Sequence, residues 1–319
     1  MSQELAVRVE GLTVRYRGRP AVDQLSLAVP TGSVFGLLGE NGAGKSTTIK
    51  TMLGLVAPQA GRVEVLGLDA RTQGELIRRK VGYVPEIPTL YEWMTPAEIG
   101  WFAAGLQTEA PGGVEGTLAR YAELIKGFEL PPNRKIKALS KGMRAKVGLS
   151  LALAPDPSLL ILDEPTSGLD LLVRREFLES MVDLAGSGRT VILSSHQVTE
   201  VERVASHVGL IHKGKLMLAE PLDELKARTF RLTLTIDRPV EALQLPSVID
   251  WKLIDVVESY RQTRMMVHAD SRDAVELLRE IPGVSSLEVE TPGLEEIYVS
   301  YMRGRVPSSF SRPFAAVGV

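Results

Sequence analysis

The stretch GENGAGKST, from Gly39 to Thr47, has the composition and spacing of a loop that binds phosphate groups. Closely spaced glycines allow backbone N–H groups to face an anion, and a helix that starts at the loop adds its positive end. Lys45 is expected to bridge the β- and γ-phosphates of a nucleotide, and Ser46 to place its hydroxyl on Mg²⁺. Thr47 is available for a neighbouring phosphate oxygen. The predicted loop consists of Gly39, Glu40, Asn41, Gly42, Ala43, Gly44, Lys45, Ser46 and Thr47.

Two carboxylates, Asp163 and Glu164, end the apolar run LLILDEP. A run of this kind is typical of a buried strand, and α/β sheets gather their ligands at the carboxyl ends of strands. Asp163 could hold Mg²⁺ through water, and Glu164 could polarise the water that attacks a γ-phosphate. The alternative is a charged turn before Pro165, which the phosphate loop upstream disfavours.

His196 and Asp170 follow in the motifs SSH and SGLD. His196 comes directly after the strand-like run TVILSS, so it would reach the same edge of the sheet and could contact the γ-phosphate or the attacking water. A histidine near a helix start can equally be structural. Asp170 suits the N-cap of the next helix, and a capping role does not exclude a role at the nucleotide.

The motif LSKGM, from Leu139 to Met143, separates a polar segment from the helical run RAKVGLSLALA. Ser140 is a good helix cap and Gly142 allows a tight turn, so the motif by itself predicts only the start of a helix. The five residues are Leu139, Ser140, Lys141, Gly142 and Met143.

The elements that must position these residues alternate between strands and helices. The strand-like run SVFGLLG precedes the phosphate loop, and KSTTIKTMLGL follows it as a helix with Ile49, Met52 and Leu53 on one face. Two further buried strands, SLLILD and TVILSS, flank the helical pattern LLVRREFLESMVDLA. This alternation predicts an α/β fold with a parallel sheet. Before it, LAVRVEGLTVRY and AVDQLSLAVP predict short strands near an edge.

Three other parts of the chain have different patterns. Helical segments dominate from about residue 86 to 155, which predicts a helical subdomain inserted in the α/β core of residues 1–220. Alternating strands and one helix then predict a small α+β domain, 221–303, of the ferredoxin-like kind. The last segment, 304–319, has turn residues and no period, so a flexible tail is expected.

Composition limits the remaining possibilities. The chain has 37 Lys and Arg against 39 Asp and Glu, so no overall charge favours nucleic acid or an anionic membrane surface. It has no cysteine, which excludes disulfides, metal–thiolate sites and a cysteine nucleophile and fits the cytoplasm. No stretch is apolar enough to span a bilayer, and the N-terminus does not look like a secretory signal. A membrane role would therefore need a partner.

Taken together, GENGAGKST, LSKGM, LLILDEP, SGLD and SSH resemble, in order and separation, the nucleotide-binding subunits of ABC transporters over about residues 5–220. The resemblance implies a P-loop NTPase core that hydrolyses ATP with Mg²⁺. It also implies two ATP sites shared between two such subunits, here a homodimer. The phosphate loop of one subunit then faces Ser140 and Gly142 of the other, whose helix start suits a γ-phosphate.

Two further positions take a role from the resemblance. Tyr16 corresponds to the aromatic residue that stacks on adenine, although a strand-edge tyrosine is the alternative. Glu86, in GYVPEIPTL, stands where most members have a glutamine that contacts Mg²⁺ and the attacking water. The side-chain oxygen is kept, but a charge is added.

The motif LSKGM corresponds to the signature motif of the family, and Lys141 and Met143 depart from its usual form. With these departures the chain resembles ATPase subunits of exporters whose permease is a separate polypeptide. The resemblance then implies an enzyme held at the cytoplasmic face of a membrane through its permease, with no nucleic acid partner. Tyr91, Trp93, Trp101 and Phe102 lie where the family docks its permease, and a core cluster is the alternative.

Two other functions are possible in principle. One is a soluble ABC-type ATPase that acts on ribosomes or DNA; members of those kinds carry two phosphate loops or a long coiled coil, and neither is present. The other is a regulatory protein without catalysis, which the intact Lys45, Ser46, Asp163, Glu164 and His196 disfavour.

Overall fold

The computed structural model describes residues 4–167, 169–236, 251–259 and 262–304. Contacts divide the chain into two compact units, Met1–Ala219 and Glu220–Val319. The predicted tail, 304–319, lies outside the described residues except for Gly304, which ends the last helix.

The first unit is built on a mostly parallel sheet with the strand order β10-β9-β3-β8-β7-β6. β3 pairs in parallel with β8 and β9, and β7 pairs in parallel with β6 and β8. Every residue of β3, β7 and β8 is buried, as the apolar runs predict for strands covered on both faces. The strands are β3 (Val34–Leu38), β6 (Val81–Val84), β7 (Leu159–Asp163), β8 (Thr190–Ser195), β9 (His207–His212) and β10 (Lys215–Pro221).

A second sheet in this unit has the order β2-β1-β4-β5 and is antiparallel. Its strands are β1 (Leu5–Tyr16), β2 (Arg19–Pro30), β4 (Ala60–Val65) and β5 (Leu68–Asp69). The two predicted strands are confirmed, because LAVRVEGLTVRY coincides with β1 and AVDQLSLAVP lies within β2; only their predicted short length was wrong, since each has 12 residues. Both strands alternate between buried and exposed residues, and their buried faces join the core, which stabilises pairing over their whole length.

The helix α1 (Lys45–Met52) packs between the two sheets. Ile49, Met52 and Leu53 are fully or almost fully buried in a core that contains residues of β1, β2, β3 and β7, so the predicted apolar face is confirmed. The other helices of the core are α2 (Gly74–Lys80), α6 (Leu171–Gly186) and α7 (Val198–Val204), of which α6 and α7 contact β3 and β8.

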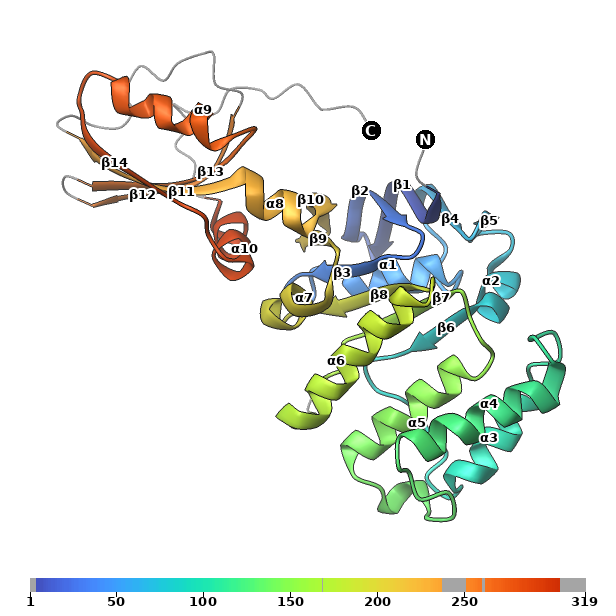
Figure 1. Ribbon diagram of the computed structural model, residues 1–319. Coiled ribbons are helices and arrows are strands. Elements are labelled where there is room, and N and C mark those ends of the chain that lie inside the picture. Colours follow the sequence, from blue (N-terminus) through green and yellow to red (C-terminus); the bar gives the residue numbers. More distant parts are fainter. Residues whose placement is uncertain (1–3, 168, 237–250, 260–261, 305–319) are drawn as a thin grey trace. The chain divides into compact units, whose positions relative to one another are not determined.

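Helices α3, α4 and α5 pack on one another between β6 and β7 in the sequence (Figure 1, green). Thr95 starts α3 with a reciprocal capping box to Glu98, and Gly100 lets α3 pack closely on the ring of Tyr121. The elements are α3 (Pro96–Ala104), α4 (Gly113–Gly127), a 3₁₀ turn (Ile136–Ala138) and α5 (Lys141–Leu153). Their own buried cluster includes Ile99, Ile125, Ile136 and Val147.

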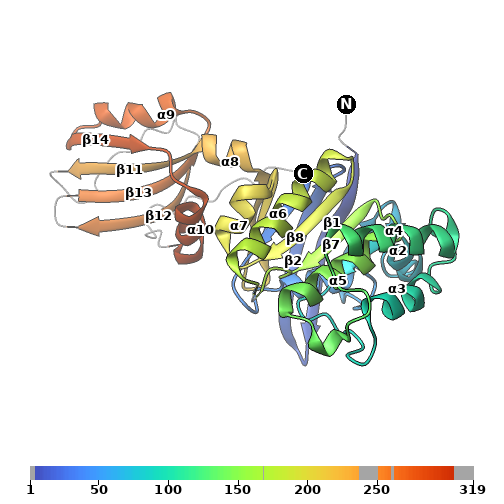
Figure 2. The same cartoon turned by 60° about the horizontal axis from the view of Figure 1, so that its bottom comes forward.

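The second unit is an α+β domain with an antiparallel sheet in the order β12-β13-β11-β14, as Figure 2 shows. One face of β11 places Phe230, Leu232 and Leu234 in the core, together with Val275 of α9. The elements are α8 (Leu222–Arg228), β11 (Thr229–Ile236), β12 (Trp251–Ser259), β13 (Gln262–Ala269), α9 (Arg272–Glu276), a 3₁₀ turn (Leu277–Glu280), β14 (Val284–Glu290) and α10 (Leu294–Arg303). The connection between β11 and β12 lies outside the described residues.

Candidate functional site

The phosphate loop joins the carboxyl end of β3 to the start of α1. Gly44 has a φ of 113°, and a Cβ atom there would lie 2.7 Å from the carbonyl oxygen of Ala21. The turn after β9 also supports the loop, because Gly214 N donates to the Ala43 oxygen over 2.8 Å. The glycine is therefore required by its backbone angle and by the close approach of a neighbouring strand.

Lys45 is buried with its ammonium group at the centre of the loop. Nζ donates to the carbonyl oxygen of Gly39 over 2.7 Å and to that of Glu40 over 3.3 Å. It also lies 2.9 Å from Oε1 of Glu164, whose side chain is only 8% exposed. A loop of backbone N–H groups around a buried ammonium group is suited to bind polyphosphate.

Glu164 connects Lys45 to His196. Oε2 of Glu164 lies 2.7 Å from Nδ1 of His196, while the imidazole side chain remains 41% exposed and accessible to solvent. Glu164 has a φ of 49°, a left-handed conformation that non-glycine residues rarely adopt. Such strain is typical of positions where a site fixes one side-chain direction.

Asp163 lies behind Glu164 and is 3% exposed. Ser194, directly opposite on β8, donates from Oγ to Oδ1 of Asp163 over 2.6 Å and accepts from the Glu164 backbone N over 3.1 Å. Ser194 was not among the residues predicted for the site. The signal was present, because strand alternation places the side chains of Ser194 and Ser195, the last two residues of β8, on opposite faces of the sheet.

A cavity of about 350 Å³ brings most of these groups together. Its lining consists of Ala21, Glu40, Asn41, Gly42, Ala43, Gly44, Lys45, Ser46, Thr47, Glu86 and Glu164. His196 and Asp163 are not part of this lining; His196 is next to it through its contact with Glu164. Tyr16 is not part of this lining; it is half exposed at the end of β1, opposite Arg19.

The LSKGM residues do not line this cavity. Ser140 caps α5, because its Oγ accepts from Met143 N over 3.2 Å, which confirms the predicted helix start. Leu139 and Lys141 line a different cavity of about 640 Å³, together with Glu86. Asp170 similarly caps α6 by accepting from Val173 N over 3.0 Å.

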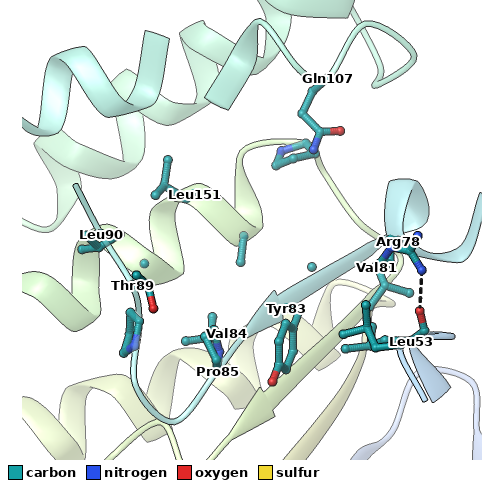
Figure 3. Close-up of a pocket in the computed structure, with 16 residues that line it drawn as sticks. Leu53, Arg78, Val81, Tyr83, Val84, Pro85, Thr89, Leu90, Gln107 and Leu151 are labelled. Carbon is teal, nitrogen blue, oxygen red and sulfur yellow. Dashed lines mark hydrogen bonds between the residues drawn. The ribbon is translucent and has the colours of Figure 1, made fainter. Parts of the chain in front are cut away.

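A groove of about 380 Å³ lies on another side of β6, between the end of α1 and helix α5 (Figure 3). Tyr83 and Val81 form one wall, and Leu90 and Leu151 lie on the other side. Burial raises the pKa of Tyr83 to about 12, and the charge of Asp163 acts in the same direction. Arg78 fixes one end of the groove by donating to the carbonyl oxygen of Leu53 over 3.0 Å.

Four aromatic side chains are exposed, two in the segment before α3 and two in the second half of that helix. Trp93 and Trp101 are 64% and 69% exposed, and Tyr91 and Phe102 are about half exposed. The ring of Tyr91 lies 5.9 Å from those of Trp93 and Phe102. These residues therefore form a surface patch and do not belong to the core.

A buried lysine in a phosphate loop, two carboxylates at the end of β7 and a histidine at the end of β8 define a P-loop nucleoside triphosphate hydrolase. Residues 22–167 match the profile of the ABC transporter domain family.

Two curated proteins are similar over most of their length. The bacitracin transport ATP-binding protein BcrA of Bacillus licheniformis is 34% identical over 226 residues, which cover 70% of this chain and 72% of that protein. The Nod factor export ATP-binding protein I of Neorhizobium galegae is 32% identical over 302 residues, which cover 92% of this chain and 84% of that protein. A solved ATP-binding subunit of an ABC transporter is 32% identical, with a TM-score of 0.63 over 70% of this chain and 92% of that one.

The chain therefore belongs to the ABC transporter ATP-binding proteins, and it is an ATPase. Among the helices of the described residues, none combines the length and the apolar character needed to cross a bilayer.

Proposed function

We propose that this ATPase powers an exporter as a dimer of two identical chains, with a permease supplied by a separate polypeptide. One observation carries the proposal. The phosphate loop and the signature motif LSKGM, with Ser140 and Gly142, both belong to the pattern of this family, yet no residue of LSKGM lines the phosphate-loop cavity of its own chain. A second copy would complete each site.

We propose the following role for each residue. Lys45 binds the β- and γ-phosphates, and backbone N–H groups of the loop bind the remaining oxygens. Glu164 accepts a proton from the attacking water, and His196 holds that carboxylate through Nδ1 and presents the other side of its ring to solvent. Asp170 approaches the same nucleotide from the start of α6, and Tyr16 stacks on adenine.

The residues present also fit Mg²⁺, which prefers hard oxygen ligands from one or two carboxylates and from substrate phosphates. Ser46 and Glu86 line the phosphate-loop cavity, and Asp163 is held in place by Ser194. When bound, the ion neutralises charge that develops on the phosphate oxygens. Glu86 would add one negative charge compared with the usual glutamine, so we expect it to strengthen the requirement for the cation.

From the partner subunit, the start of α5 would complete the site. Ser140 already directs its hydroxyl to the first turn of the helix, and no acidic residue occupies that turn. A helix start without acidic residues favours an approaching anion, here the γ-phosphate bound by the other chain.

The permease would dock on the groove beside β6 and on the aromatic patch formed by Tyr91, Trp93, Trp101 and Phe102. Exposed tryptophan and tyrosine side chains are enriched at protein interfaces and often dominate their binding energy. This docking would hold the ATPase at the cytoplasmic face of a membrane. The names of the relatives, bacitracin transport and Nod factor export, support export for this chain. The transported compound is a property of the permease.

Dimerisation can be tested with Glu164→Gln. We expect this variant to bind ATP, to hydrolyse it about 10²–10⁴-fold more slowly and to double its mass by light scattering when Mg²⁺ and ATP are present. Adding Ser140→Arg should prevent the doubling. The matched control is Ser271→Arg, which removes a serine cap of the same geometry in the second unit. Normal hydrolysis by Glu164→Gln, or ATP-dependent doubling in the presence of Ser140→Arg, would show that the proposal is wrong.

The permease can be sought in a neighbouring reading frame that encodes several membrane-spanning segments. Co-expression should yield a complex that is weakened by Trp101→Ala and left intact by Leu277→Ala, which removes an exposed apolar side chain in the second unit. A complex that withstands loss of both Trp93 and Trp101 would exclude the aromatic patch as the docking surface.

A further inference from the structure

A second buried carboxylate, Glu200, lies in α7 close to the site but outside the phosphate-loop cavity. It is 4% exposed. Its Oε2 accepts from Thr166 Oγ over 2.7 Å and from Ser195 Oγ over 3.0 Å. Its Oε1 lies 3.3 Å from Nε of Arg174. A buried charge of this kind is costly unless it is paired and hydrogen-bonded, and Glu200 is both.

The partners of Glu200 come from two different loops. Thr166 is two residues after Glu164, in the segment that leads from β7 to α6. Ser195 immediately precedes His196, and it also accepts from Gln197 N over 3.0 Å. One carboxylate oxygen therefore joins the segment that carries Glu164 to the turn that carries His196.

Arg174 joins the same two segments a second time. It donates through one terminal nitrogen to Oε1 of Gln197 over 2.8 Å and through the other to the carbonyl oxygen of Leu169 over 3.2 Å. Gln197 follows His196, and Leu169 precedes Asp170. The pair of Glu200 and Arg174 thus connects the segment after β7 to the turn after β8, on the face of the sheet opposite Asp163.

We propose that Glu200 is a positioning residue for ATP hydrolysis, which sets the separation between Glu164 and His196 and fixes the start of α6. The proposal rests on the catalytic roles given above to Glu164 and His196. Its physical basis is that a displacement of about 1 Å in a reacting group lowers rates by about 10²-fold. In the part of the chain that the structure describes, the hydrogen bonds and ion pair of Glu200 and Arg174 involve no residue of the phosphate loop, so we expect ATP affinity to change little when Glu200 is replaced.

A purely structural role makes a different prediction. If Glu200 only stabilised the fold, its loss would lower the unfolding temperature, and the folded fraction would hydrolyse ATP at the normal rate. A positioning role lowers kcat of the folded protein and leaves KM for ATP unchanged.

The experiment measures kcat and KM for ATP and the affinity for a fluorescent ATP analogue, on the full chain with Mg²⁺. Glu200→Gln keeps the size of the side chain but places an amide near Arg174; we expect kcat to fall about 10–100-fold and KM to change less than about twofold. Thr166→Val, which removes one hydroxyl, should give about a 3–10-fold loss, and Thr166→Ser should restore the normal rate. The matched control is Glu179→Gln, because Glu179 is also paired with arginine side chains, those of Arg175 and Arg203, but is exposed on α6.

The outcomes are distinct. A normal kcat for both Glu200→Gln and Thr166→Val would overturn the proposal, as would a rise in KM with unchanged kcat. If Glu200→Gln does not fold, the comparison of Thr166→Val with Thr166→Ser tests the proposal, which then requires a lower kcat for Thr166→Val and a normal kcat for Thr166→Ser. Normal hydrolysis by Glu164→Gln would refute the proposed catalytic roles themselves, whereas an inactive Glu164→Gln with a fully active Glu200→Gln would refute only the positioning role.

Discussion

Removal of the Ser194 hydroxyl tests the support beneath the two carboxylates. Ser194 is fully buried, and its Oγ donates to Asp163 over 2.6 Å. In Ser194→Ala, Asp163 loses a hydrogen bond to a charged group, which contributes about 1.5–3 kcal/mol. The second bond of Oγ, from Glu164 N, matters less because that N–H also donates to the Ser194 carbonyl oxygen over 3.2 Å.

The expected effect on stability follows from the size of the first unit. For a domain of about 150–250 residues, 1 kcal/mol changes the unfolding temperature by about 2–4 °C. Ser194→Ala should therefore unfold about 3–12 °C below the wild type. Calorimetry of the full chain can measure this, because the transition of the ATPase unit is the one that ATP shifts upward.

Ser194→Ala should also change the Mg²⁺ concentration that hydrolysis requires. Loss of a side chain that orients a carboxylate ligand typically lowers metal affinity or activity by about 10–100-fold. The Mg²⁺ concentration that gives half-maximal hydrolysis should therefore rise by about 10–100-fold in Ser194→Ala. The control is Ser180→Ala, which removes a hydroxyl that donates to the carbonyl oxygen of Phe177 in its own helix. An unfolding temperature within about 1 °C of the wild type would refute the reasoning, since about 3 °C is the smallest expected change.

Three further predictions concern other parts of the chain. Gly100→Ala should destabilise the first unit by about 1–3 kcal/mol, because the new Cβ would lie 2.0 Å from the Tyr121 ring; Gly127→Ala, with nothing within 4 Å, should stabilise it by about 0.5–1 kcal/mol. Asp170→Ala should cost about 1 kcal/mol through the lost cap of α6. Burial, aided by Arg228 and Lys252 and opposed by Asp270, lowers the pKa of His268, so the second unit should lose stability as pH falls below about 6.5, by at most about 1.4 kcal/mol per pH unit.

Urea unfolding measures all three effects. The pH effect is measured as the difference in unfolding free energy between the wild type and His268→Gln, to which only the histidine contributes. Because the pKa of His268 is lowered in the folded state, the unfolded chain binds the proton first as pH falls. A constant difference between pH 7.5 and 5.5 would contradict it. Equal effects of Gly100→Ala and Gly127→Ala would contradict the steric argument, and an unchanged midpoint for Asp170→Ala would contradict the capping argument.

The parallel sheet and its loop were predictable because their signals are local. The strands around SVFGLLG, SLLILD and TVILSS are continuous apolar runs, and the phosphate loop has fixed glycine positions. In the second unit, the alternating stretches FRLTLTI, RMMVHA and SSLEVE predict the strands that are β11, β13 and β14 in the structure. The strand β12 was not predicted, because WKLIDVVES changes its burial pattern at a bulge and so lacks a regular alternation.

Contacts between distant segments were harder to predict. Ser194 and Asp163 meet only because β7 and β8 are neighbours in a particular register, and no feature of either segment states that register. Glu200 looks like an ordinary helix residue in VTEVERV until Thr166 and Arg174 are brought beside it by the fold. Sequence patterns identify reactive residue types well, but they do not identify the side chains that orient them.

The end of β8 assigns neighbouring residues to separate tasks: Ser194 supports Asp163, Ser195 binds Glu200, and His196 contacts Glu164. Because successive residues of a strand point to opposite faces, inserting or deleting one residue within β8 would reverse all of these directions at once. A one-residue insertion or deletion in β8 would act like several substitutions, whereas loops of the same protein tolerate such changes. Comparison of homologous chains should therefore find length variation in the loops and a constant length between Thr190 and His196.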